Sequence, residues 1–251
     1  MAVRYGSFCP VAKAAEVITG RWTPLILYEL MRGSERFGEI QNGVPLMPRS
    51  LLARRLRELE LDGIIYRISQ PGLRGHIYRL TPAGESLRPL IDQLGAWGNE
   101  WRVPHIDDND RNVAHLMWSM RVLFGVPTPG GRDFVIHFDF SNVPRRDHKI
   151  RQWWYILRDG TVDLCYTDMG FDPDVTVRAD LLEFFRVVHG HGSLQKARRE
   201  GHIAFEGDPR AVAFFLECLD VSEPPVPRFI RITTPPPPPP SRVLRMKSQA
   251  A

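Results

Sequence analysis

Cysteines are scarce in this sequence, and long apolar runs are missing. The 251 residues include three cysteines, Cys9, Cys165 and Cys218, whose wide separation matches no metal-ligand spacing. No stretch approaches the ~18 apolar residues that a transmembrane helix needs. We therefore expect a protein of the reducing cytoplasm, without a membrane partner.

Motifs of catalysis are also missing. The sequence has no nucleophile elbow, no phosphate-binding glycine loop and no pair of carboxylates in a catalytic pattern. His189 and His191 offer two metal ligands, but transition-metal sites usually need three or four. We therefore expect no enzyme, no cofactor and no metal.

Charge is distributed unevenly along the chain, although its net value is only +4. Residues 1–103 carry 14 basic and 10 acidic side chains, whereas residues 104–240 carry 16 basic and 19 acidic ones. The last eleven residues add three basic side chains. This distribution favours contact between the first segment and a polyanion.

The first segment reads as a series of helices. Apolar residues at helical spacing predict a first helix ending near Gly20 and a second beginning at Thr23-Pro24, with Thr23 as its N-cap. A third helix over 35–41 leads through a turn into a longer helix over 48–62. Short helix, turn and longer helix is the order of a helix-turn-helix.

The helix over 48–62 combines an apolar stripe, formed by Leu52, Leu56 and Leu59, with a basic face. Such a face can be a solvated helix surface. A helix also fits the major groove, where arginine forms paired hydrogen bonds with guanine. We expect contacts with base edges from Arg49, Ser50 and Arg54, and a phosphate contact from Arg57.

Two strands over 64–68 and 76–80, joined by a glycine-rich loop, follow this helix. A hairpin in this position is typical of the wing of a winged helix-turn-helix. The loop carries Arg74, which we expect at a phosphate.

A further helix is predicted from Thr81-Pro82 to residue 102. Its apolar side chains would pack on the domain itself or pair two copies in a two-fold dimer, which we favour. A homodimer would hold its recognition helices about 34 Å apart, on the half-sites of a palindromic double-stranded DNA operator. The expected dimer contacts are Leu87, Leu90, Leu94, Trp97 and Trp101.

Several motifs in the first hundred residues resemble the HxlR family of winged-helix regulators. They are Cys9-Pro10-Val11, Gly20-Arg21-Trp22-Thr23, Arg36-Phe37-Gly38-Glu39-Ile40, the run LARRLREL over 52–59 with Asp62-Gly63-Ile64, and Tyr78-Arg79-Leu80-Thr81-Pro82-Ala83-Gly84. The resemblance implies a homodimeric bacterial transcription factor, often a sensor of aldehydes, oxidants or metabolites.

The family resemblance also draws attention to Cys9, because some members sense thiol-reactive molecules through a cysteine at this position. A thiol just before a helix lies at the positive end of the helix dipole. Cysteine is also a small hydrophobe that packs near helix ends. Both interpretations stay open: a thiol sensor and a structural residue.

The rest of the chain predicts an α+β region. A polar linker over 104–112 precedes a helix, an antiparallel sheet with a tight hairpin at Asp159-Gly160, and further helices around a strand over 203–205. The domains expected are 1–105, 106–222 and a flexible Pro-rich tail over 223–251, which contains the polyproline tract 235–240.

The run from Asp174 to Asp208 resembles the sterol carrier protein fold, in which a sheet and helices surround an apolar tunnel. The resemblance implies an apolar small-molecule effector in residues 106–222, although the aromatic side chains there would equally fill an ordinary core. The sequence thus predicts a ligand-responsive DNA-binding regulator. The alternative is a lipid or sterol carrier whose first domain only dimerises.

Overall fold

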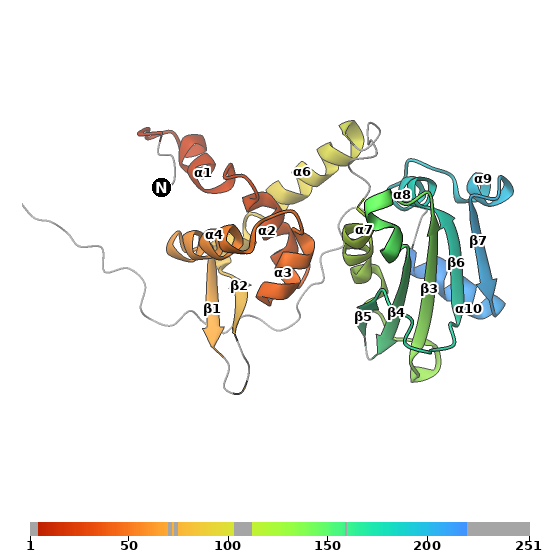
Figure 1. Cartoon of the computed structure of the whole chain (residues 1–251). Coiled ribbons are helices and arrows are strands. Elements are labelled where there is room, and N and C mark those ends of the chain that lie inside the picture. The colour runs from red at the N-terminus through yellow and green to blue at the C-terminus, as the bar shows by residue number, and fades with distance from the viewer. Residues whose placement is uncertain (1–4, 70–71, 73–74, 103–111, 159, 220–251) are drawn as a thin grey trace, which may run out of the picture.

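The structure is a computed structural model that describes residues 5–69, 72, 75–102, 112–158 and 160–219. Its elements form two lobes that lie side by side (Figure 1). The first lobe ends with the helix that reaches Trp101, the second begins at Val113, and each has its own cluster of buried apolar side chains. Arg74, Asp159, most of the predicted linker and the tail from 223 lie outside the described residues.

The first lobe is a winged helix-turn-helix. Antiparallel strands β1 and β2 pair in a register that places Ile65 opposite Leu80. The apolar stripe of α4 is buried as predicted, because Leu52, Leu56 and Leu59 are each at most 3% exposed. The elements are α1 (Pro10–Ile18), α2 (Thr23–Met31), α3 (Phe37–Gly43), α4 (Arg49–Leu61), β1 (Ile65–Ser69), β2 (His76–Leu80), α5 (Pro82–Glu85) and α6 (Arg88–Trp101).

The start of α2 differs from the prediction. Thr23 is the first helical residue rather than the N-cap, which is Trp22, and no side chain caps the helix. Trp22 has φ 79°, and its carbonyl accepts the N–H of Ile26 at 2.9 Å. This left-handed residue turns the chain so that the Trp22 side chain packs against the core of the first lobe.

The single helix predicted from Thr81 is two helices. Thr81 caps α5 as expected, since its hydroxyl accepts the N–H of Gly84 at 3.2 Å. The chain leaves the α-helix after Glu85 and resumes it at Arg88. Pro89 explains the break, because it lies at the start of α6 and has no N–H for the preceding turn.

The second lobe is a five-stranded sheet with helices, in the order β5-β4-β3-β6-β7. The predicted hairpin at Gly160 is present, with Arg158 opposite Thr161. The elements are α7 (Val113–Met120), η2 (Arg121–Phe124), η3 (Pro129–Gly131), β3 (Phe134–Ser141), η4 (Arg145–Ile150), β4 (Gln152–Arg158), β5 (Thr161–Cys165), β6 (Val175–Asp180), α8 (Leu181–Val188), α9 (Leu194–Arg199), β7 (Ile203–Gly207) and α10 (Pro209–Leu219).

The prediction of an antiparallel sheet is wrong at one pair of strands. β3 and β6 run parallel, with Ile136 opposite Val175 and Phe140 opposite Ala179. Two hairpin reversals make β5 run in the direction of β3. The connection from Tyr166 to Asp174 then crosses to the other side of β3, where β6 starts again in that same direction. The sheet is therefore mixed.

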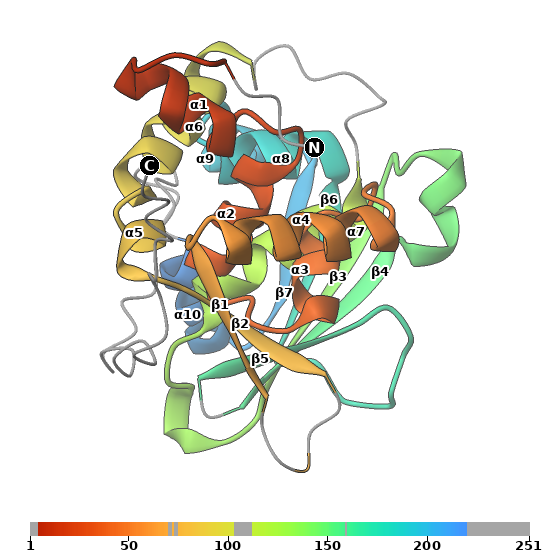
Figure 2. The same ribbon diagram turned by 90° about the vertical axis from the view of Figure 1, so that its left-hand side faces the viewer.

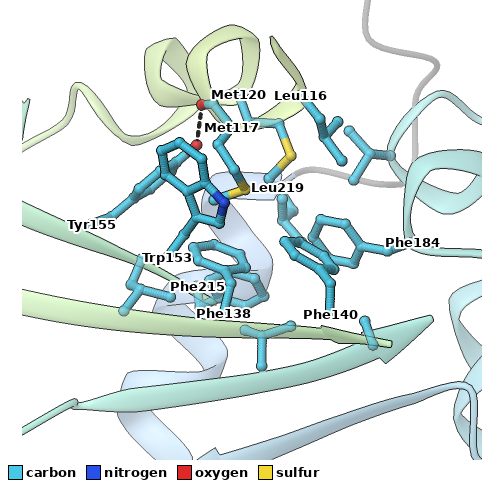
Figure 3. Close-up of a cluster of buried hydrophobic side chains, with 14 of the residues drawn as sticks. Leu116, Met117, Met120, Phe138, Phe140, Trp153, Tyr155, Phe184, Phe215 and Leu219 are labelled. Atoms are coloured by element: carbon cyan, nitrogen blue, oxygen red, sulfur yellow. Dashed lines mark hydrogen bonds between the residues drawn. The ribbon is translucent and has the colours of Figure 1, made fainter. Parts of the chain in front are cut away.

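Aromatic side chains fill the core of the second lobe. Phe138, Tyr155 and Phe215 are completely buried. The centroid of the Phe138 ring lies 5.0 Å from that of Tyr155 and 6.0 Å from that of Phe215. Figure 3 shows these rings beneath α7, where the Tyr155 hydroxyl donates to the carbonyl of Met117. Burial raises the pKa of Tyr155 well above its ordinary value. The residues expected around a tunnel are thus packed against one another.

Candidate nucleic-acid interface and its connection to the second lobe

The basic face of α4 is presented to solvent. Arg49, Ser50, Arg54 and Arg57 are all exposed, whereas the leucines on the opposite side of the helix are buried. Figures 1 and 2 show α4 on the side of the first lobe that faces away from the second lobe. The face predicted to enter the major groove is therefore unobstructed by the rest of the chain that the structure describes.

The arginines of α4 differ in the contacts that they make with neighbouring side chains. The Arg49 guanidinium lies 5.0 Å from the centroid of the Phe37 ring. Arg55, which the sequence left between the two faces of α4, is partly buried and binds the Glu58 carboxylate at 2.7 Å. Arg54 approaches that carboxylate only to 3.9 Å, so its side chain keeps most of its donors for another partner.

The wing is tied to the helices by Glu35, a residue that sequence reasoning missed. Its carboxylate accepts hydrogen bonds from Arg79 at 2.8 and 3.3 Å, and its carbonyl accepts the N–H of Tyr78 at 2.8 Å. The hydrogen bond with Glu35 raises the pKa of Arg79 above its already high ordinary value. Together these contacts fix strand β2 against the loop between α2 and α3.

A second tie joins the base of the wing to α5. The Thr81 hydroxyl donates to the carbonyl of Gly63 at 2.6 Å, and the Thr81 N–H donates to the carbonyl of Ile64 at 2.9 Å. Gly84 packs so closely there that a Cβ would lie 2.2 Å from the Ile64 carbonyl oxygen. The hydrogen bonds of Thr81 and the close packing of Gly84 therefore explain why the structure needs these two residue types here.

The exposed surface of α6 is strongly apolar. Leu90, Leu94, Trp97 and Trp101 are 46–58% exposed and lie at helical spacing. Leu87, predicted to belong with them, is partly buried against the core of the first lobe. The other four residues form what we call the α6 stripe.

Cys9 is exposed at the N-cap position of α1, and its side chain makes no capping hydrogen bond. Cys165 and Cys218 are half-buried in the second lobe. Burial raises the pKa of Cys218 to about 11. Among the three cysteines, Cys9 is therefore the one most open to solvent.

A buried ionic cluster connects the two lobes. The Glu29 carboxylate accepts hydrogen bonds from Ser34 Oγ and from Trp118 Nε1, each at 2.8 Å, and it lies 3.7 Å from the guanidinium of Arg121. That guanidinium lies 3.6 Å from the centroid of the Trp118 ring. Burial lowers the pKa of Arg121 to about 10, while the charge of Glu29 opposes this shift.

Further contacts reinforce this junction. Arg32 donates to the hydroxyl of Tyr28 at 2.5 Å and to the carbonyl of Ser119 in the second lobe. At the far end of α6, His191 Nε2 lies 2.9 Å from the carbonyl oxygen of Asn99. Sequence reasoning missed this junction, although one signal was present: Glu29 is the single charged residue in the apolar run from Leu25 to Met31.

Two features are missing from the residues that the structure describes. None of their helices has the length and apolar character required to cross a membrane. No group of three or more potential metal ligands occurs among the same residues, and His189 and His191 remain a pair.

The basic helix and the hairpin that follows it define a winged helix-turn-helix DNA-binding module. The family described as HxlR-like helix-turn-helix matches residues 17–106. The uncharacterised HTH-type transcriptional regulator YvaP of Bacillus subtilis is 37% identical over 102 residues, which cover 40% of this chain and 94% of that protein. The HTH-type transcriptional regulator YodB of the same organism is 35% identical over 100 residues, covering 39% of this chain and 89% of YodB.

Solved structures match over the same share of the chain. The redox regulator HypR in its reduced form is 34% identical, with 38% of this chain and 94% of that chain covered and a TM-score of 0.36. The chain belongs to the HxlR-like helix-turn-helix family of transcriptional regulators. Its second lobe lies beyond the residues that the family match covers.

Proposed function

We propose that this protein is a homodimeric regulator of the cytoplasm that reads a palindromic DNA operator and responds to a small-molecule effector through its second lobe. The observation that carries the proposal is the exposed basic face of α4, a helix that lies on the side of the first lobe away from the second lobe. A duplex can approach this face without displacing any described part of the chain.

The side chains of α4 have separate roles in this proposal. Arg49, Ser50 and Arg54 stand near the N-terminal end of the helix, from which recognition helices contact base edges. Arg57, one turn further on, and Arg74 of the wing loop bind phosphates and fix the register on the duplex. Because Glu35 and Thr81 hold the hairpin against the helices, the wing and α4 approach DNA as one unit.

Dimerisation rests on the α6 stripe. Four large apolar side chains along one helix, each about half exposed, form a surface that a second copy would cover. A two-fold axis beside α6 would bring the same stripe of both copies together, so that one patch serves both sides. The two α4 helices would then read half-sites about one DNA turn apart.

Effector control is the part of the proposal that involves the second lobe. The ionic cluster at Glu29 and the contact between His191 and Asn99 join that lobe both to the helix-turn-helix and to α6. A change in the second lobe would therefore reach the elements that read DNA and pair the copies. The packed aromatic core does not favour the alternative of a lipid carrier. Exposed Cys9 remains a candidate thiol sensor.

Selection of binding sites from a random duplex library tests the proposal. We expect enrichment of a palindrome bound by two chains, and we expect Arg54→Ala to weaken binding to it by about 1–3 kcal/mol. Arg178→Ala is the matched control, because Arg178 in the second lobe is 59% exposed and Arg54 is 60% exposed. No enrichment at low salt, or equal effects of the two substitutions, would contradict the proposal.

A further inference from the structure

A cleft with a volume of about 820 Å³ lies between the two lobes. One wall is formed by α3 with its flanking residues and by the start of β2, and the other wall by α7, β4 and β5. Its volume falls within the range of about 300–1,000 Å³ that is usual for small-molecule sites, which occur preferentially between domains. The cleft thus touches both the helix-turn-helix and the wing.

Four aromatic rings line the walls of this cleft. They belong to Phe37 in the first lobe and to Trp118, Trp153 and Tyr166 in the second. The indole N–H groups of the two tryptophans are already engaged, with Glu29 at 2.8 Å and with the carbonyl of Ile150 at 2.6 Å. The Arg121 guanidinium covers one face of Trp118, and Trp153 is 6% exposed, so the rings offer their remaining faces and edges, which suit a flat aromatic molecule.

The carboxylate of Asp163 favours a positive charge on that molecule. Arg36 contributes one guanidinium to the cleft, and the Glu39 carboxylate already accepts the N–H groups of Glu35 and Arg36 at 2.8 and 2.9 Å. Asp163 is 69% exposed and approaches Arg158 only to 3.8 Å, while Arg158 binds Asp133 at 2.6 Å. A cation between the aromatic rings and this carboxylate gains from both.

The geometry points to this cleft as the effector site, with a planar aromatic cation as the class of ligand. The inference rests on the proposed function and adds to it the place and the chemistry of the effector. The effector lies between the lobes rather than inside the second lobe, where packed aromatic side chains already occupy the space.

Trp118 provides the physical link between the ligand and DNA reading. Its ring lines the cleft, its Nε1 donates to Glu29 of α2, and its face is covered by Arg121. The opposite wall includes Ile77, which forms an isolated β-bridge with Arg36 between the wing and the start of α3. An occupant of the cleft would hold the wing and the second lobe in one arrangement.

Titration of the full chain with berberine, a fluorescent planar aromatic cation, tests the ligand class. We expect saturable binding of one berberine per chain, and affinity for the aromatic anion 1-anilinonaphthalene-8-sulfonate at least about 10-fold lower, because like charges oppose binding. Asp163→Asn should weaken berberine binding about 2–5-fold, since it removes one exposed carboxylate.

Substitutions in the walls test the position. A Cβ at Gly38 would meet nothing within 4 Å, so larger side chains can be introduced there. Gly38→Trp should fill the cleft and reduce berberine affinity at least about 10-fold, whereas Gly38→Ala, the matched control, should leave it within about 2-fold. Tyr166→Ala removes a half-exposed ring and should cost about 3–10-fold.

DNA binding provides the regulatory measurement. We expect a saturating concentration of berberine to shift the affinity of the wild type for its selected DNA site at least about 5-fold, and DNA to shift berberine affinity by the same factor. Gly38→Trp should bind DNA with no such shift, which also corrects for any direct interaction of berberine with DNA.

Three results would overturn the inference. They are equal berberine binding by Gly38→Trp and the wild type, DNA affinity that berberine leaves unchanged, and displacement of berberine by a peptide of residues 232–247, which would make the proline tract of this chain the occupant. A wild type that selects no DNA site would instead contradict the proposed function, and the berberine titration would still report on the cleft.

Discussion

The indole N–H of Trp118 in the second lobe donates a hydrogen bond of 2.8 Å to the carboxylate of Glu29 in the first. The Glu29 side chain is 2% exposed, so its carboxylate is stabilised by Trp118, Ser34 and Arg121 and not by water. Two of these three partners, Trp118 and Arg121, belong to the second lobe. The first lobe therefore carries a buried charge that it cannot solvate alone.

Removing that hydrogen bond should destabilise the protein. Trp118→Phe keeps a ring but loses the donor, and leaving a buried carboxylate short of one partner costs about 1–3 kcal/mol. The free energy of unfolding in urea measures the effect. Tyr166→Phe is the control, because it removes a polar atom from a side chain that is 58% exposed. Equal stability of the two variants would argue against the role assigned to Trp118.

Two helical glycines should respond in opposite directions to alanine. A Cβ at Gly84 would lie 2.2 Å from the Ile64 carbonyl oxygen, and overpacking of this kind costs about 1–3 kcal/mol. A Cβ at Gly98 meets nothing within 4 Å, so Gly98→Ala should gain up to about 1 kcal/mol of helix stability. Thermal unfolding compares the two variants, and a stable Gly84→Ala would contradict the close approach.

Arg57 should contribute to DNA affinity through charge alone. We expect Arg57→Ala to weaken binding similarly for all sequences and to reduce the slope of log K against log salt by about 1, because one phosphate contact releases about one counterion. Fluorescence anisotropy from 50 to 300 mM salt would provide the slope. Arg186→Ala in the second lobe, where Arg186 pairs with Glu183 at 2.6 Å, should leave it unchanged.

A charge on the α6 stripe should separate the proposed dimer. Leu94 is 51% exposed in the middle of the stripe, and Leu94→Glu would place a carboxylate in a two-fold apolar contact. Sedimentation velocity should then show a monomer with an intact fold by circular dichroism. Leu61→Glu, at a leucine that is 87% exposed beyond the stripe, should leave the dimer intact. A monomeric wild type would contradict the proposal.

His189 should make stability fall in acid. Burial lowers the pKa of His189 to about 4, and nearby His191, Arg32 and His115 act in the same direction against a hydrogen bond with the Phe185 carbonyl. Histidine in the unfolded chain has a pKa of about 6.5, so between about pH 6.5 and 4 the unfolded chain binds a proton at this residue and the folded chain does not. This difference lowers the free energy of unfolding by up to roughly 3 kcal/mol.

The variant His189→Gln isolates this contribution. It should lose less stability between pH 7 and pH 4.5 than the wild type does, because glutamine takes up no proton. His148→Gln, at an exposed histidine, should retain the dependence of the wild type. Unfolding by urea at the two pH values measures both, and identical losses in all three proteins would exclude His189 as the source.

Features that depend on nearby residues could be predicted from the sequence. The stripe of Leu52, Leu56 and Leu59, the hairpin after α4 and the tight turn at Gly160 each follow from periodicity or turn chemistry within a few residues. The cap at Thr81 belongs to the same group.

Other features depend on residues far apart in the chain. The parallel pairing of β6 with β3 places Val175 opposite Ile136. The alternation of apolar and polar residues along a strand does not indicate whether its neighbour runs parallel or antiparallel, so the sequence could not predict this pairing. Two of the partners of Glu29, Trp118 and Arg121, lie about ninety residues away in the chain. The break before α6 was overlooked because Pro89 fits the apolar pattern of the helix while it removes a hydrogen-bond donor.

Helix α6 contacts both lobes and presents a third surface to solvent. Ile91, near its beginning, is buried in the core of the first lobe, and Asn99, near its end, contacts His191 of the second lobe. Its exposed side carries the α6 stripe that the proposed dimer would cover. In such a dimer, a small rotation of one lobe against the other would tilt α6 at the symmetry axis and change the distance between the two α4 helices. The half-site spacing that the dimer binds best would then depend on the arrangement of the second lobe.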